Sequence, residues 1–203
     1  MISSASCKLN KNTTSLAFLP MYQYEINAKA RYSSARNLPT YTCQHIDIER
    51  HLPQDAINKL RDIEKTSSDV AKDTWEFLKS VTLLEGSQTC SRHLQNCPFQ
   101  TSCLDISGSM CVHYSTMGKK VDGALLKKNG TSNKLLQIYV KYHCSRKTPL
   151  LIHENLQNFD STELASLLAE GGYKYLCRIN VCAADAGLAV NPRSRGCLGC
   201  PID

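Results

Sequence analysis

Three short segments in the second half of the chain carry side chains that could act together on a substrate. Cys111 follows Gly108, Glu154 follows an apolar run, and Arg193 and Arg195 follow a run of small residues. A thiol, a carboxylate and a guanidinium group suit covalent catalysis, in which a thiolate attacks while charged groups hold the substrate. Each also has an ordinary interpretation: a small buried residue for the cysteine, a turn cap for the glutamate and a solvated pair for the arginines.

The remaining cysteines suggest a second chemistry. One irregular group and one separate pair stand out: Cys90, His93, Cys97 and Cys103, and then Cys197 and Cys200. Structural zinc takes four Cys or His ligands, commonly as two close pairs. The spacing here leaves a zinc or thiol site open as the alternative to catalysis.

The cysteine count and the absence of an export signal bear on the compartment. The chain has 11 cysteines, an odd number, and the best candidate for a signal, residues 15–20, is short and ends in Pro20. No apolar run approaches the roughly 20 residues of a membrane helix. We therefore expect an intracellular protein with reduced thiols and no membrane partner. Its net charge of +6 would help it approach a polyanion such as nucleic acid.

The reactive segments need a scaffold, and the hydrophobic pattern predicts alternating strands and helices. Residues 1–20 are rich in Ser, Thr, Asn and Lys, and we expect a loose lead-in there. Strands are predicted at 21–24, 41–48, 103–107, 149–153 and 173–182. Helices are predicted at 26–35, within 56–81, and at 134–143 and 162–170. A polar connection is predicted at residues 85–100.

This alternation predicts an α/β fold with a mostly parallel sheet and flanking helices over residues 21–203. Ligands in such folds bind outside the carboxyl ends of the strands. Each reactive segment follows a predicted strand, so we expect Cys111, Glu154 and the two arginines at one edge of one sheet.

Several segments, in their order along the chain, resemble motifs of one enzyme family. Cys111, Tyr114, Ser115 and Gly118 follow the spacing Cys-x-x-Tyr-Ser-x-x-Gly. Further elements are Tyr24-Glu25-Ile26-Asn27-Ala28, Asp47-Ile48, Glu154-Asn155-Leu156, Gly172-Tyr173, Ala183-Ala184-Asp185-Ala186-Gly187 and Asn191-Pro192-Arg193-Ser194-Arg195. This series is similar to the catalytic domain of the DNA cytosine-5 methyltransferases.

The resemblance implies the Rossmann-like fold of S-adenosylmethionine-dependent methyltransferases, in incomplete form, with DNA as the partner. Cys111 would add to C6 of a cytosine flipped out of the duplex, and Glu154 would hydrogen-bond N3 of the ring. Arg193 or Arg195 would hold the base. A nuclear location would follow from the substrate.

The cofactor implied by the resemblance is S-adenosyl-L-methionine. Glu25 and Ile26 match the family segment that holds its ribose, and Asp47 and Ile48 match the segment that contacts its adenine. The family's Phe-x-Gly-x-Gly turn has no counterpart, because all ten glycines lie at or after Gly86.

The catalytic loop and the end of the chain also depart from the family pattern. Met110 replaces the usual proline and Val112 the usual glutamine. The chain ends at Asp203, soon after Arg195, so we expect no target-recognition region within it. The sequence predicts a truncated or degenerate methyltransferase domain or, as the alternative, a non-catalytic Cys-rich zinc or thiol binding module on an α/β scaffold.

Overall fold

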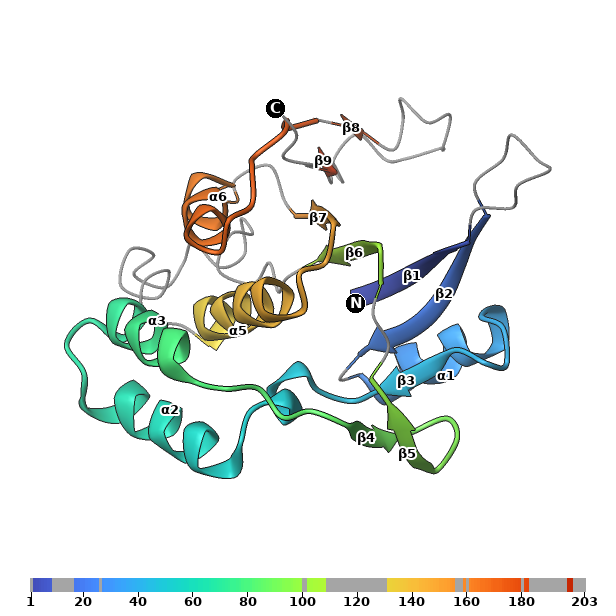
Figure 1. The fold of residues 1–203 in the computed structure, drawn as a ribbon, viewed down its shortest axis with the longest axis horizontal. Coiled ribbons are helices and arrows are strands. Elements are labelled where there is room, and N and C mark those ends of the chain that lie inside the picture. The colour runs from blue at the N-terminus through green and yellow to red at the C-terminus, as the bar shows by residue number, and fades with distance from the viewer. Residues whose placement is uncertain are drawn as a thin grey trace.

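The computed structural model describes residues 2–8, 17–25, 27–99, 102–108, 131–155, 159, 161–179, 181–182 and 197–198. A five-stranded sheet in the order β3-β2-β1-β6-β7 forms its centre, with helices packed around it (Figure 1). The strands of this sheet are β1 (Ile2–Lys8), β2 (Ala17–Tyr24), β3 (Cys43–His45), β6 (Leu104–Gly108) and β7 (Leu150–Glu154). The helices are α1 (Ala28–Asn37), η1 (Ile48–His51), α2 (Gln54–Thr66), α3 (Val70–Ser80), α5 (Thr131–Arg146) and α6 (Ser161–Glu170).

Four of the five strands in the sheet run in the same direction. β2 pairs parallel with β3, β6 pairs parallel with β7, and β1 lies between the two pairs and runs antiparallel to β2 and β6. One row of aligned residues crosses the sheet: His45, Tyr24, Ile2, Ser107 and His153. The predicted α/β class is confirmed, and the carboxyl ends of β2, β3, β6 and β7 share one edge.

The first twenty residues differ from the loose lead-in that their composition predicts. Residues 2–8 form β1 in the middle of the sheet, and β2 begins at Ala17, upstream of the predicted strand start at Met21. The prediction failed because it depended on apolar side chains, whereas strand pairing uses backbone N–H and C=O groups that every residue here except proline supplies.

Helix α5 lies between the sheet and the α2–α3 pair (Figure 1). Its central residues are buried, including Leu136, Ile138 and Val140. Helices α2 and α3 are amphipathic as predicted, and each buries a leucine, Leu60 at 2% exposure and Leu78 at 0%. Burying one such side chain contributes about 1.5–3 kcal/mol. In the described part of the chain, no helix is long and apolar enough to cross a membrane.

Two predicted segments have a different structure. The expected polar connection at 85–100 contains an antiparallel hairpin, β4 (Ser87–Cys90) and β5 (Gln95–Pro98). The expected strand at 173–182 is absent over 173–179, and only β8 (Val181–Cys182) forms, paired with β9 (Cys197–Leu198). Short polar hairpins give a weak periodic signal, because neither face needs to be apolar.

Candidate functional site

The best-defined part of the predicted edge is the end of the parallel pair β6–β7. The last residue of β6, Gly108, is aligned with the last residue of β7, Glu154. A Cβ on Gly108 would lie 2.9 Å from Glu154 Oε2 and 3.3 Å from the Glu154 carbonyl oxygen. The carboxylate therefore lies against the glycine, at the point where the chain leaves the sheet towards residue 109. Cys111, Arg193 and Arg195 lie outside the described residues.

The other two acids predicted for the site follow the neighbouring strands β2 and β3. The backbone N–H of Glu25 donates to the His45 carbonyl oxygen at 3.1 Å and extends the pairing of these strands. Each acid also accepts a nearby backbone N–H, Glu25 Oε1 from Asn27 at 2.8 Å and Asp47 Oδ1 from Glu49 at 2.9 Å. Glu25 and Asp47 thus lie at the same edge and help to shape the turns that follow it.

The two isoleucines predicted beside these acids have different outcomes. Ile48 is 6% exposed and packs in the hydrophobic core. Ile26 lies outside the described residues. The structure therefore presents the acids of this half of the edge, with Ile48 as a packing residue beneath it.

A buried polar network lies behind the Gly108–Glu154 pair. Ser107 Oγ donates to Tyr139 Oη at 2.8 Å and lies 3.3 Å from His153 Nδ1. Tyr139 Oη donates to Asp105 Oδ1 at 3.4 Å, and His143 Nε2 lies 3.6 Å from the same oxygen. Burial disfavours charge here. It raises the pKa of Asp105 to about 7, and lowers the pKa of His143 to about 3 and of His153 to about 4.

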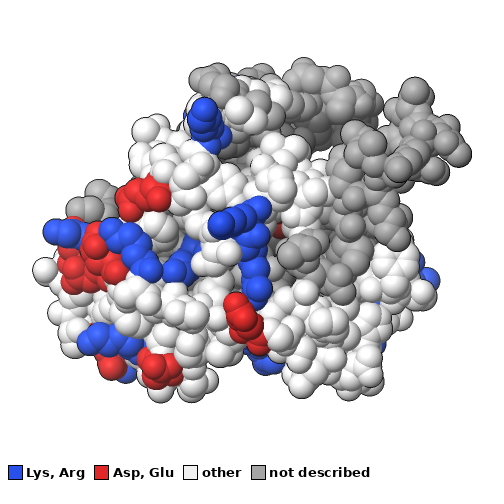
Figure 2. All heavy atoms as spheres, in the orientation of Figure 1, with Lys and Arg blue, Asp and Glu red and all other residues white. Residues whose placement is uncertain are grey.

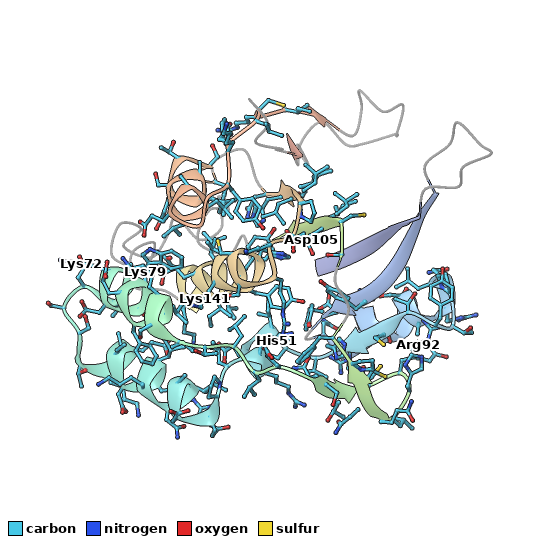
Figure 3. The ribbon with its side chains drawn as sticks, in the orientation of Figure 1. His51, Lys72, Lys79, Arg92, Asp105 and Lys141 are labelled. Atoms are coloured by element: carbon cyan, nitrogen blue, oxygen red, sulfur yellow. The ribbon has the colours of Figure 1, made fainter. Side chains whose placement is uncertain are left out.

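A second buried cluster joins β2 to η1 and α5. Tyr24 Oη hydrogen-bonds His51 Nε2, and Tyr142 Oη donates to Tyr22 Oη at 3.1 Å. Burial lowers the pKa of His51 to about 3. His51 and Asp105 lie on opposite sides of α5 in the view of Figure 3. Both clusters were missed from the sequence, because an isolated His or Asp in an apolar segment does not indicate its partners.

Three cysteines and a histidine converge where the β4–β5 hairpin meets the start of β3. His93 Nδ1 lies 3.3 Å from Cys97 Sγ, 3.4 Å from Cys90 Sγ and 3.7 Å from Cys43 Sγ. All four possible ligand atoms lie within 4.8 Å of one another. Their types and number match a structural zinc site.

This group differs by one residue from the group that the sequence suggested. Cys90, His93 and Cys97 come together as expected, but Cys43 takes the fourth place and Cys103 is not a member. Cys43 was missed because the contact between β3 and the hairpin brings it to Cys90 from a distant part of the chain. Sequence spacing carries no signal for such a contact.

A cavity of about 480 Å³ borders the buried polar network through Tyr139. It is bounded by β7, the end of α5, α6 and residues 171–176, and includes His153 and Cys144 in its wall. Neither Gly108 nor Glu154 lines it.

Comparisons of this chain with protein-family models, with curated proteins and with solved structures find no match.

Proposed function

We propose that the chain carries a catalytic domain of the DNA cytosine-5 methyltransferase type, with its base-binding residues at the carboxyl edge of β6 and β7. The observation that carries this proposal is the alignment of Gly108 with Glu154. Gly108 lies against the Glu154 carboxylate, and Cys111 follows Gly108 by three residues in the sequence. A thiol and a carboxylate that approach one pyrimidine ring from adjacent strand ends suit addition at C6.

The proposed chemistry begins with the Cys111 thiolate. Its electron pair forms the S–C6 bond, and the C5=C6 electrons make C5 nucleophilic while Glu154 hydrogen-bonds N3 and assists its protonation. S-adenosylmethionine, when bound, would supply the methyl group to C5 and leave as the thioether S-adenosylhomocysteine. Loss of the C5 proton and elimination of the thiolate then restore the ring and the enzyme. Arg193 or Arg195 would hold the base.

The residues at the other half of the edge fit only part of the cofactor. Carboxylates at the ends of the adjacent strands β2 and β3, Glu25 and Asp47, suit the hydroxyl and amino groups of a nucleoside. The methionine portion lacks its expected partner, since no glycine precedes Gly86. Moreover, β1 runs antiparallel at the sheet centre, so its carboxyl end lies at the opposite edge. We therefore propose a domain with Glu154 at the edge as a base-binding residue and with an incomplete cofactor site.

DNA as the partner is supported by the substrate chemistry and by the net charge of +6. In the face shown in Figure 2, basic and acidic side chains lie intermixed over α2 and α3. We place the proposed DNA contact at the carboxyl edge because Glu154, the proposed base-binding carboxylate, lies there.

The proposal can be tested without the cofactor. Reversible addition of a thiolate to C6 allows the C5 hydrogen to exchange with solvent. We expect release of tritium from DNA containing [5-³H]cytosine, abolished by Cys111→Ser and lowered at least about 100-fold by Glu154→Gln. Cys103→Ser is the matched control and should keep the exchange rate.

The contrary result is a folded chain that releases no tritium from single-stranded or duplex DNA. The non-catalytic binding module would then be the better description. The cysteine and histidine group at β3 and the hairpin is the observation that favours this second candidate.

A further inference from the structure

The cysteine and histidine group carries an inference that does not rest on the methyltransferase proposal. We propose that Cys43, Cys90, His93 and Cys97 bind one Zn²⁺ ion in a structural site. The four side chains supply three sulfurs and one imidazole nitrogen, a ligand set typical of structural zinc.

The distances agree with tetrahedral coordination. Zn–S bonds of about 2.3 Å and a Zn–N bond of about 2.0–2.1 Å place each sulfur about 3.5 Å from the nitrogen in a tetrahedron. The three sulfur–nitrogen distances to His93 Nδ1 are 3.3, 3.4 and 3.7 Å. The side chains therefore need little movement to coordinate the ion.

Hydrogen bonds around the group orient two of the proposed ligands. His93 Nε2 lies 2.9 Å from the Thr40 carbonyl oxygen. A proton on Nε2 donates to that oxygen and leaves Nδ1 as the coordinating atom, an arrangement common around metal-bound histidine. Cys90 Sγ accepts the backbone N–H of Gln44 at 3.3 Å and of His93 at 3.5 Å. Such donors stabilise negative charge on a metal-bound thiolate.

The burial of the ligands indicates a structural site and not a catalytic one. Cys43, Cys90 and Cys97 are 6%, 0% and 5% exposed. Catalytic zinc keeps one coordination position for water or substrate. Here all four positions come from the protein, and on binding each thiol gives up its proton and becomes a thiolate ligand.

The ion would fasten the hairpin to the edge of the main sheet. β3 has only three residues and is the outermost strand on its side. The hairpin already contacts it through Ser91, whose backbone N–H donates to the Gln44 carbonyl oxygen at 2.8 Å. Gln88 of β4 also donates to the Asp47 carbonyl oxygen at 3.5 Å, so the hairpin reaches the turn that follows β3. Zinc bound at Cys43 would hold the start of this short strand, while the Gln88 hydrogen bond holds the turn after its end.

The test is the metal content of the purified full chain, measured by mass spectrometry of the metal after gel filtration. We expect about one zinc per chain in the wild type and at least a fivefold loss in Cys97→Ser. Cys103→Ser and Cys144→Ser remove cysteines outside the group and should keep one zinc. Because a ligand variant could fail to fold, the wild type is also exchanged into Co²⁺. A tetrahedral site with three thiolates then gives a sulfur-to-cobalt charge-transfer band and intense visible d–d bands.

Two results would overturn the proposal. One is a folded wild-type chain that takes up neither zinc nor tetrahedral cobalt under reducing conditions. The other is zinc that remains in Cys97→Ser and is lost in Cys103→Ser. Neither readout depends on DNA or on methyl transfer, so failure of this proposal is distinct from failure of the proposed function.

Discussion

Gly108 and Glu154 end two adjacent parallel strands in register, and a Cβ on the glycine would come within 2.9 Å of the glutamate Oε2. This closeness makes Gly108 a positioning residue for the carboxylate. In the proposed reaction the Glu154 carboxylate must be placed accurately against the pyrimidine ring, because misplacement by about 1 Å can lower the rate about 100-fold.

Gly108→Ala is therefore expected to lower C5 exchange at least about tenfold while the chain stays folded. The added methyl group would displace the Glu154 carboxylate, which can rotate away from it. The measurement is tritium release together with the melting temperature. Gly86→Ala is a poor control because its φ of 101° strains any side chain. Ser87→Ala, in the exposed part of β4, is the better one. Unchanged exchange in Gly108→Ala would remove the positioning role.

Binding of the cofactor tests the other half of the edge. If no residues bind the methionine portion, the dissociation constants of adenosine and S-adenosylmethionine should agree within about fivefold. Glu25→Ala should weaken both at least about tenfold by calorimetry, because a hydrogen bond to a charged group is worth about 1.5–3 kcal/mol. Glu85→Ala, an exposed acid in a loop, should leave both unchanged. Binding of S-adenosylmethionine 100-fold tighter than adenosine would show that another segment replaces the glycine turn.

The buried Asp105 predicts a pH-dependent effect of one substitution. Its folded pKa, raised to about 7, lies above the ordinary value, so the stability that its protonated form provides is lost as pH rises towards and through 7. Asp105→Asn removes this loss. The free energy of unfolding of the variant, relative to that of the wild type, should rise by about 2–3 kcal/mol from pH 5 to pH 8 in urea unfolding. Asp62→Asn, on the exposed face of α2, should show no such change. An equal effect of Asp105→Asn at both pH values would contradict the shift.

His51 and His153 predict loss of stability in acid. Their folded pKa values, about 3 and about 4, lie below the ordinary value of 6.5, so the unfolded chain takes up two protons that the folded chain does not. The Asp105–His143 pair adds little to this difference in bound protons. In this pH range the folded pair holds one proton between its two side chains, and the unfolded chain also holds one, on His143. Between pH 6.5 and about 4.5 the free energy of unfolding should fall by about 2–3 kcal/mol per pH unit. A flat profile in urea titrations over this range would show that these histidines are not neutral in the folded chain.

The link between α3 and α6 gives a prediction on stability alone. Trp75 Nε1 donates to Glu170 Oε2 at 2.8 Å. Glu170→Ala should cost about 1 kcal/mol and change the tryptophan fluorescence, because the indole loses a charged acceptor. Glu170 also lies 3.6 Å from Lys79, so the control is Glu76→Ala, which removes the other acidic partner of Lys79 and leaves the indole hydrogen bond. If both variants destabilise equally and neither changes the fluorescence, the indole hydrogen bond contributes nothing measurable.

The sequence predicted those elements whose side chains alternate between core and solvent. Helices α2 and α3 were predicted because Leu60 and Leu78 belong to apolar stripes at helical spacing. β1 was not, because a central strand that pairs through its backbone needs no such stripe. For the sites, a strand end indicated the place of Glu154, whereas Glu25 and Asp47 were assigned from the family resemblance. Cys43 could not be predicted in this way, since its proximity to Cys90 depends on how the hairpin packs against β3.

β1 makes the sheet a single unit, and this has a consequence for truncation. The parallel pairs β3–β2 and β6–β7 share no backbone hydrogen bonds with each other, and β1 is the strand between them. Without residues 2–8, the sheet would become two separate two-stranded ribbons, each with an unprotected backbone edge facing the gap. Such edges recruit strands from other chains. Proteolysis or an alternative start downstream of Lys8 would therefore divide the shared carboxyl edge into two halves and favour self-association.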